Sequence, residues 1–540
     1  MAHLSAAVTI VPVSIDSSDS VTAPRLSGPG TLSGPGTLPG PGTLPEPGVS
    51  ASRGATAESG DGPGPGASRR GTLRRATPRH RGHPPTRIWQ LAATVALTTV
   101  ALSVLLTVEI RHENNGLVTI GHRAGPEVVA TSDLYFALND MDAQVANVLL
   151  VGDQQNLGVS RAEALRIYEQ RRQQVDHDIR QAASAATDPG SRQTIDEVLD
   201  RLGSYEALAA RTILLDQQTP HPAGQPSAAT LAQYRQATDL LRAQLLPAAR
   251  QLTDRHGQTL EASYEAQRGR IGVERVLVAV IGTALVVVLL VLQLYLARRF
   301  RRLLNPVLAG ATVLAVAGVA LSVGLLSSEA GHLTVAKKNA FDSILALSRA
   351  RAVSYDANAD ESRYLVDPAL AAQYQQAFLT KTQQLADLPD ATLVTWDRDF
   401  AAALAAYQRD HDDVGWNGLF GTEFRNITFT GERAAAQTTL RRLQTYQLDD
   451  RRIRDLATSG RRGDAIALCT SYAPGGSNYA FDQYDQSLAA LIAVNQRAFD
   501  RAIADGQREL AGRTVALWIG CAVILALLAV GVRPRLIEYR

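Results

Sequence analysis

Residues 276–296, VLVAVIGTALVVVLLVLQLYL, contain no charged side chain. A helix of this length crosses the hydrocarbon layer of a bilayer, which is about 30 Å thick. Four arginines follow within residues 298–302, and such basic clusters mark the cytoplasmic end of a membrane helix. A second apolar stretch begins shortly afterwards, at residues 306–326. The sequence therefore predicts two membrane helices joined by a cytoplasmic turn at residues 297–305.

Two further apolar stretches, residues 88–108 and 515–532, raise the number of predicted membrane helices to four. Arginines also cluster within residues 69–87, before the first stretch, and in the tail at residues 533–540. An even number of crossings places both termini on one side, and the positive-inside rule makes that side the cytoplasm. The expected location is the cell membrane, with several crossings and two domains outside.

The connection between the first two membrane helices, residues 109–275, shows helical periodicity. Its apolar residues recur at steps of three and four, which is typical of one buried helix face. Ser160 followed by Glu163 is a pattern that begins helices, because both side chains satisfy free backbone N–H groups. Helices are predicted at residues 133–151, 161–186, 192–218 and from 227 into the second membrane helix, which together make an antiparallel four-helix bundle.

The connection before the last membrane helix, residues 327–514, repeats this plan around an insertion at residues 415–473. The start of the insertion is rich in glycine and aromatic residues and is not predicted to be helical. The predicted fold class is an all-α membrane protein, in which four transmembrane helices carry two extracytoplasmic four-helix-bundle modules. In the second module helices are predicted at residues 329–366, 368–387, 390–414, 431–458, 464–471 and 477–513.

The N-terminal tail, residues 1–87, repeats hexapeptides such as LSGPGT and ends in a basic patch. A tail dominated by glycine, proline and serine buries too little apolar surface to offset the ordering of its backbone, so disorder is expected. A variable cytoplasmic linker is the simplest interpretation, and a proline-rich docking tail is the alternative. The basic patch is expected to fix the topology and to contact lipid headgroups.

The composition limits the expected chemistry. The net charge is only +2, from 54 basic and 52 acidic residues, and this gives no reason to expect a nucleic-acid partner. Cys469 and Cys521 lie in the second connection and in the last apolar stretch, so no intrachain disulfide is expected. The sequence carries no HExxH, paired CxxC, phosphate-loop or kinase signature, and neither an enzymatic activity nor a cofactor is predicted.

Two histidine patterns raise the question of a metal site. Asp176, His177 and Asp178 are consecutive in a predicted helix, so their side chains point about 100° apart and cannot converge on one ion. His112 and His332 each lie a few residues beyond a membrane stretch, which is more typical of interfacial anchoring than of ligation. No metal ligand is predicted.

A polar stripe is the strongest candidate for a binding site. Arg349, Asp356, Asp360 and Arg363 follow one another at helical spacing and line one face of the first helix of the second module. One interpretation is a solvent-exposed face with weak ion pairs. The other is a polar seam that meets a ligand or a partner, and charge reversal at Asp360 or Arg363 would then impair signalling and leave the module folded.

The first module has a related polar cluster that includes Asp140 and Asp142. In both modules an Asp/Asn cluster precedes a Leu-Val pair and a terminal aspartate. The duplication indicates either a duplicated binding role, in which case both aspartates are candidate binding residues, or shared ancestry alone.

The insertion is the second candidate. Its aromatic residues either cover the core of their own module or form a docking face for another protein outside the membrane, since exposed apolar loops mark interfaces. The residues concerned are Trp416, Phe420, Phe424 and Phe429.

Three segments resemble a known family: DLYFALNDMDA (133–143), SRARAVSYDANADESRYLVDP (348–368) and RNITFTGER (425–433). They are similar to an actinobacterial family of four-pass membrane proteins that includes GlnX-like proteins, with chemoreceptor-like sensor modules and no output domain. The resemblance implies a relay that carries amino-acid availability from an extracytoplasmic solute-binding protein to a cytoplasmic serine/threonine protein kinase. No ligand residue is implied by it.

The sequence thus predicts an integral membrane signal-transduction protein whose two bundles sense a solute and pass a helix movement to a cytoplasmic partner, with a homodimer as one expected assembly. Two other classes fit the same pattern. One is a structural scaffold of the cell envelope, and the other is an accessory subunit of a membrane transport complex. The uniformly apolar membrane stretches disfavour a transporter, whose helices are normally polar or broken.

Overall fold

The computed structural model describes residues 84–121, 125–154, 157–186, 189–300 and 305–537. Residues 79–540 belong to one compact unit. Nearly every described residue is helical, and the β-type pairing found among them is one isolated bridge between Asp387 and Asn417. The all-α prediction is confirmed. The expectation of a disordered tail falls on residues outside the described ranges, except at residues 84–87, which are helical as the start of α1.

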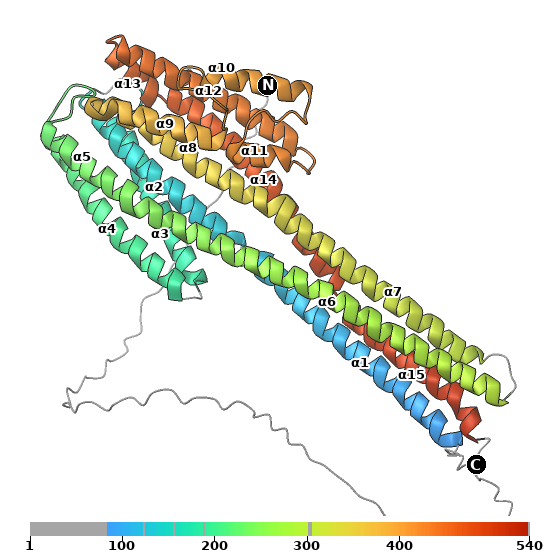
Figure 1. Ribbon diagram of the computed structural model, residues 1–540. Coiled ribbons are helices and arrows are strands. Elements are labelled where there is room, and N and C mark those ends of the chain that lie inside the picture. Colours follow the sequence, from blue (N-terminus) through green and yellow to red (C-terminus); the bar gives the residue numbers. More distant parts are fainter. Residues whose placement is uncertain (1–83, 122–124, 155–156, 187–188, 301–304, 538–540) are drawn as a thin grey trace, which may run out of the picture. The chain divides into compact units, whose positions relative to one another are not determined.

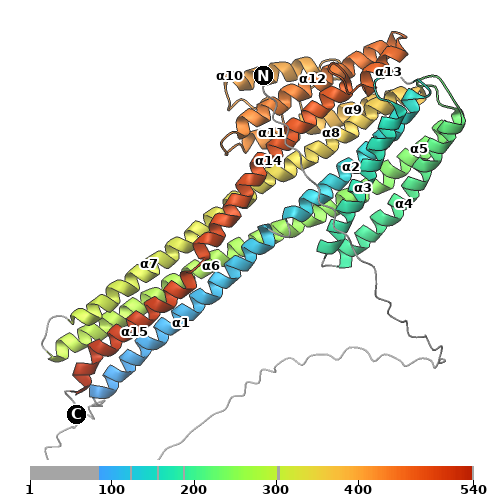
Figure 2. The same cartoon turned by 180° about the vertical axis from the view of Figure 1, so that it is seen from behind.

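Four helices carry the apolar stretches: α1 (Pro84–Thr119), α6 (Leu246–Phe300), α7 (Pro306–Thr334) and α15 (Arg513–Ile537). In the described part of the chain, four continuous helical segments are long and apolar enough to cross a membrane. α6 packs against α1 and α7, and α15 completes the group by packing against the same two helices (Figure 1, Figure 2). These four helices are compatible with a multi-pass membrane protein.

Small and polar side chains join these helices. Gly282 of α6 packs directly against Val319 of α7, so a larger side chain there would push the two helices apart. The Gln293 amide donates to the Leu308 carbonyl across the same contact at 3.0 Å. Asn305 accepts from the backbone N–H of Val307 to cap α7, and its own amide donates to a carbonyl of α15.

The first module consists of α2 (Gly125–Val151), α3 (Arg161–Ala185), α4 (Pro189–Gln218), α5 (Ala228–Leu240) and the first part of α6. Ser160 and Ser227 cap α3 and α5 by accepting backbone N–H bonds of 3.1 Å, as the sequence pattern predicts for Ser160. A π-helical segment, η2 (Leu241–Leu245), links α5 to α6 without a break. The helix predicted from residue 227 into the membrane is therefore present.

The second module differs from the prediction at two points. The helix predicted at residues 390–414 is α10, which is shorter at both ends and spans only Trp396–Arg409. Its start is delayed because Asp390 has a positive φ of 62° and lies in a turn. The start of the insertion, predicted to be irregular, contains α11 (Gly418–Arg425), which buries Phe420 and Phe424 one turn apart. The elements are η3 (Val335–Phe341), α8 (Asp342–Val366), η4 (Pro368–Leu370), α9 (Ala371–Leu385), α10 (Trp396–Arg409), α11, α12 (Glu432–Thr458), α13 (Arg462–Thr470) and α14 (Ser477–Leu510).

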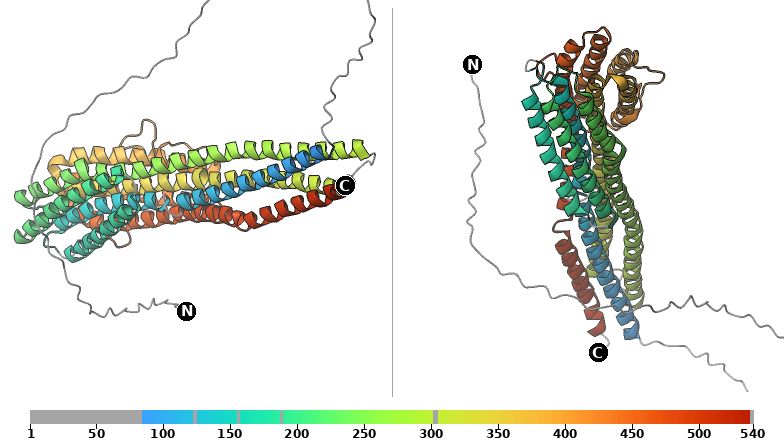
Figure 3. Two further views of the ribbon diagram at one scale, coloured as in Figure 1. Left: turned by 90° about the horizontal axis from the view of Figure 1, so that it is seen from below. Right: turned by 90° about the vertical axis from the view of Figure 1, so that its left-hand side faces the viewer.

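The two modules pack against each other through α2 and α8, and almost all residues of both helices are buried. One hydrophobic core includes Leu138 and Val145 of α2 together with Leu365 of α8 and Ile466 of α13. Figure 3 shows the helices from two further directions, with α6 running from the first module into the membrane group. Because most faces of α2 and α8 are covered, most of their charged residues are buried or half-buried as well.

The aromatic residues of the insertion lie inside the second module. Trp416, Phe420 and Phe424 are 1%, 0% and 4% exposed and belong to one core cluster, while Phe429 is half-buried. The Trp416 ring lies 5.1 Å from that of Phe424 in an edge contact. The burial of Trp416, Phe420 and Phe424 favours the interpretation that they cover the core of their own module, and α11 turns Phe420 and Phe424 toward that core.

Candidate functional site

Arg363 of α8 lies at the centre of a buried charge network between the modules. Its guanidinium is fully buried and donates to Asp142 of α2 through Nε at 3.1 Å and Nη2 at 2.9 Å. Nη1 donates to Asp360, one turn away on α8, at 2.7 Å. Burial alone would lower the pKa of Arg363, but Asp142 and Asp360 raise it well above its usual value. The two polar helices recognised in the sequence thus meet through this ion pair.

The Asp142 carboxylate is held by hydroxyl groups of the first module as well. Thr238 donates to it at 3.0 Å, Tyr234 at 3.2 Å and Tyr205 at 3.4 Å. These donors come from α5 and α4, so one carboxylate links three helices of its own module to α8. A buried carboxylate with this many partners is fixed in one orientation.

Lys381 of α9 supplies the second cation of the network. Its ammonium lies 2.7 Å from the Asp356 carboxylate and also pairs with Asp360. Burial would raise the pKa of Asp356, but Lys381 and Arg363 hold it below its usual value. The cluster of Arg363, Lys381 and the three aspartates is called the interface network below.

Two of the sequence-predicted residues lie outside this network. Asp140 faces α3, from which Arg171 donates to it at 2.6 Å, and it also accepts from Gln144 of its own helix at 2.8 Å. Arg349 lies at the surface and pairs with Asp254 of α6 at 2.7 Å, with both side chains 44% exposed. The interpretation of the polar stripe as one solvent-exposed face is therefore wrong, because α2 and α9 cover Asp360 and Arg363.

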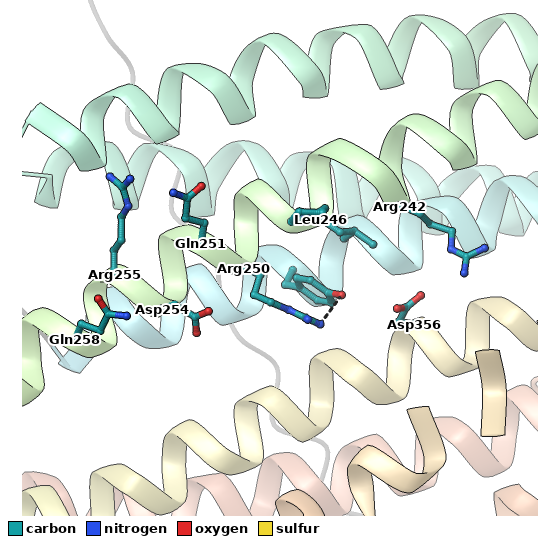
Figure 4. A pocket seen from close by; sticks show the side chains of 10 residues that line it. Arg242, Leu246, Arg250, Gln251, Asp254, Arg255, Gln258 and Asp356 are labelled. Carbon is teal, nitrogen blue, oxygen red and sulfur yellow. Dashed lines mark hydrogen bonds between the residues drawn. The ribbon is translucent and has the colours of Figure 1, made fainter. Parts of the chain in front are cut away.

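An open cleft between α6 and α8 lies beside the network (Figure 4). Its two adjoining parts have volumes of about 610 and 570 Å³ and share Arg250 and Asp254, and these volumes are typical of small-molecule sites. In Figure 4, Arg242, Arg250 and Asp254 extend toward α8, and Asp356 extends from α8 toward α6. Arg255 points away from α8.

The cleft holds two guanidinium groups that have neutral partners. Arg250 donates to the Tyr135 hydroxyl at 3.3 Å, and Arg242 lies over the Tyr374 ring at 5.8 Å. Among the described residues, neither forms an ion pair with a carboxylate. Since a guanidinium fork matches the geometry of a carboxylate, both groups are suited to hold an anionic group of a ligand.

The helices that form the cleft walls continue into the membrane group. One continuous helical segment, Ala228–Arg299, contains η2 and α6, and another, Pro306–Val366, contains α7, η3 and α8. Between the cleft and the apolar stretches, Lys337 of η3 pairs with Glu261 of α6 at 2.5 Å, and Lys338 pairs with the same carboxylate at 3.0 Å. The two walls of the cleft are therefore continuous with two neighbouring helices of the membrane group.

Sequence reasoning missed the residues that complete the site. Lys381, Arg242, Arg250 and Tyr135 come from four different elements, and none stands in a recognisable pattern with the stripe. The spacing of Arg250 and Asp254 indicates an ordinary helical ion pair, although Asp254 in fact pairs with Arg349 of the other module.

These features define a class of protein: an all-helical protein with four helices suited to cross a membrane, whose two modules share a buried ion network beside an open cleft. Residues 116–265, from the end of α1 to α6, match the family described as "Actinobacterial sensor domain". The match supports a relationship of this chain to an actinobacterial sensor family. The matched residues include Asp142, Arg242 and Arg250. No curated protein and no solved structure gives a significant match.

Proposed function

We infer that this protein senses a small solute in the cleft between α6 and α8 and relays its presence across the membrane. One observation carries the proposal: the two helices that wall the cleft continue into two membrane helices that pack against each other. A long helix transmits a shift of about 1–2 Å that a loop would absorb. The match to a sensor domain supports the same role.

The chemistry of the cleft favours a zwitterionic solute such as an amino acid. Arg242 and Arg250 suit its carboxylate, and Asp254 suits its ammonium group once the exposed pair with Arg349 opens. The resemblance to GlnX-like proteins supports an amino acid too, delivered directly or by an extracytoplasmic solute-binding protein.

In this proposal the two modules lie outside the cell membrane and both termini lie in the cytoplasm. The arginines at the ends of α6 and α15 support this orientation through the positive-inside rule. The output is a cytoplasmic partner, such as a serine/threonine protein kinase, and the protein itself is not an enzyme. Protease treatment of intact cells tests the orientation: cleavage within residues 415–473 is expected without lysis, and protection there contradicts it.

The binding test uses the full-length protein in lipid nanodiscs, titrated calorimetrically with the twenty amino acids one at a time. We expect saturable binding of a subset, lost in Arg250→Gln and retained in Arg398→Gln. Arg250 is exposed, so its substitution should leave the fold intact, and Arg398 is a surface arginine paired with its own neighbour. The absence of heat for every amino acid contradicts direct sensing, and equal binding by both variants contradicts this cleft as the site.

A cell-envelope scaffold or a transport subunit remains the alternative function. A scaffold has no need of a solute, so binding that depends on Arg250 separates the two. If an amino acid binds and no change in α6–α8 spacing follows, the relay is wrong even though the site is right. Spin labels on α6 and α8, read by pulsed electron paramagnetic resonance, measure that spacing.

A further inference from the structure

A second cluster of ligand-type side chains lies where α1 and α6 leave the apolar stretches. Glu109 and His112 belong to α1, one turn apart, and Glu274 belongs to α6. One ligand atom from each of the three lies within 4.8 Å of those of the other two. Glu109 immediately follows apolar residues 88–108, and Glu274 comes two residues before the stretch at 276–296.

The carboxylates of this cluster are buried, and some of their oxygens lack a hydrogen-bond partner. Glu109 and Glu274 are each 7% exposed, and one oxygen of each has no hydrogen-bond partner. Glu113, one turn further along α1, is 2% exposed and has no partner for either oxygen. The nearby Arg513 pairs with Glu509. Several buried carboxylates with unpartnered oxygens in one place are costly in their charged form unless a cation or protons neutralise them.

The arrangement matches a known way of building metal sites between helices. A Glu-x-x-His pair on one helix presents both ligands from the same face, and a facing helix supplies a further glutamate. Residues 109–112 read Glu-Ile-Arg-His, and Glu274 faces them from α6. The exposed His112 leaves the site open to solvent, so an ion has an entry path.

We propose that Glu109, His112 and Glu274 bind one divalent first-row transition metal ion, with Glu113 beside it as a further carboxylate. Imidazole nitrogen combined with carboxylate oxygen suits Zn²⁺, Fe²⁺ or Mn²⁺, whereas Ca²⁺ and Mg²⁺ prefer ligand sets made of oxygen alone. A tetrahedral ion with bonds of about 2.1 Å holds its ligand atoms about 3.4 Å apart, so small side-chain rotations close the site. The ion joins α1 to α6 at the end of their apolar stretches.

The test measures Zn²⁺ binding to full-length protein purified without a histidine tag and stripped with a chelator. We expect one Zn²⁺ per chain, with an affinity at least about 100-fold weaker in His112→Gln and in Glu274→Gln. His112 is exposed, so its variant should fold normally. The matched control is His332→Gln: His332 also lies beyond a membrane stretch but contacts Glu509, and its substitution should leave binding unchanged.

A spectroscopic measurement distinguishes the loss of a metal ligand from the loss of the fold. Co²⁺ in the stripped protein should give the visible absorption of a site with nitrogen and oxygen ligands, and His112→Gln should change that spectrum. The proposal is overturned if His112→Gln binds Zn²⁺ as tightly as the unmodified protein, or if excess Ca²⁺ displaces Zn²⁺. Neither result affects the solute cleft, which lies between α6 and α8.

Discussion

Replacing Arg363 by methionine tests whether the interface network holds the two modules together. The guanidinium is fully buried and pairs with Asp142 and Asp360. The substitution keeps an apolar stem of similar length and removes the charge, which leaves Asp142 buried with hydroxyl donors only. Removing one partner of a buried ion pair costs about 3–5 kcal/mol. Because the hydroxyl donors remain, we expect a cost of about 3 kcal/mol, at the lower end of that range.

Arg349 provides the matched control on the same helix. Its pair with Asp254 is 44% exposed on both sides, so Arg349→Met should cost no more than about 1 kcal/mol. With an unfolding entropy of about 2.1 cal/mol/K per residue and a helical unit of roughly 350 residues, 3 kcal/mol lowers Tm by about 4 °C. The same conversion gives at most about 1.5 °C for the control.

Thermal unfolding of the purified protein in one detergent, followed by circular dichroism, measures both shifts. A double variant, Arg363→Met with Asp142→Asn, should melt above the single Arg363 variant, because the unpaired buried charge is then gone. If Arg363→Met melts within a degree of Arg349→Met, the burial of the network is wrong. This result would also restore the expectation from sequence that substitutions at residue 363 leave the module folded.

Three further predictions concern other parts of the fold. Burial raises the pKa of Asp178 from 3.8 to about 7, so the folded state binds this proton more tightly than the unfolded chain does. The stability contributed by this group is therefore lost progressively as the pH rises from 3.8 to about 7. Asp178→Asn should raise Tm at pH 8 and leave it unchanged at pH 3.5. Phe420→Ala should lower the free energy of unfolding by about 3–5 kcal/mol, because it opens a cavity in the core. The control Val394→Ala, at an exposed position, should lower it by less than about 1 kcal/mol. Equal urea midpoints for the two variants would contradict this prediction. Gly282→Ala should lower Tm by forcing α6 away from α7, whereas Gly310→Ala, which meets no atom within 4 Å, should not.

Helical periodicity was sufficient to predict most of the fold. The continuous helix from residue 227 to the membrane needs only an N-cap at Ser227 and the lack of a strong stop, and both are visible in the sequence. The start of α10 was missed because the positive φ of Asp390 depends on its loop. α11 was missed because its glycine and aromatic content resembles that of a loop, although burial of Phe420 and Phe424 stabilises a short helix.

The site was predictable only in part, because periodicity shows which residues share a face and not what covers that face. Arg349 and Arg363 lie on one stripe, yet the first is exposed and the second is fully buried between α2 and α9. The pairing of Asp142 with Arg363 joins residues 221 positions apart, and no local pattern indicates it. Lys381 belongs to no recognisable pattern in the sequence, and it reaches Asp360 only because α9 packs on α8.

In the proposed function, the π-helical segments mark where the two cleft helices respond to a ligand. η2 places Arg242 at the cleft, and η3 places Lys337 against Glu261 between the cleft and the membrane group. The hydrogen bonds of a π segment span one residue more than those of an α-helix, and such segments are frequent at functional sites. A ligand that draws Arg242 toward α8 acts at the end of α6 that already contains such a segment, while the pair of Lys337 and Glu261 keeps η3 in register with α6. The movement that reaches the membrane is then a joint shift of α6 and α7, and Lys337→Met should uncouple solute binding from it.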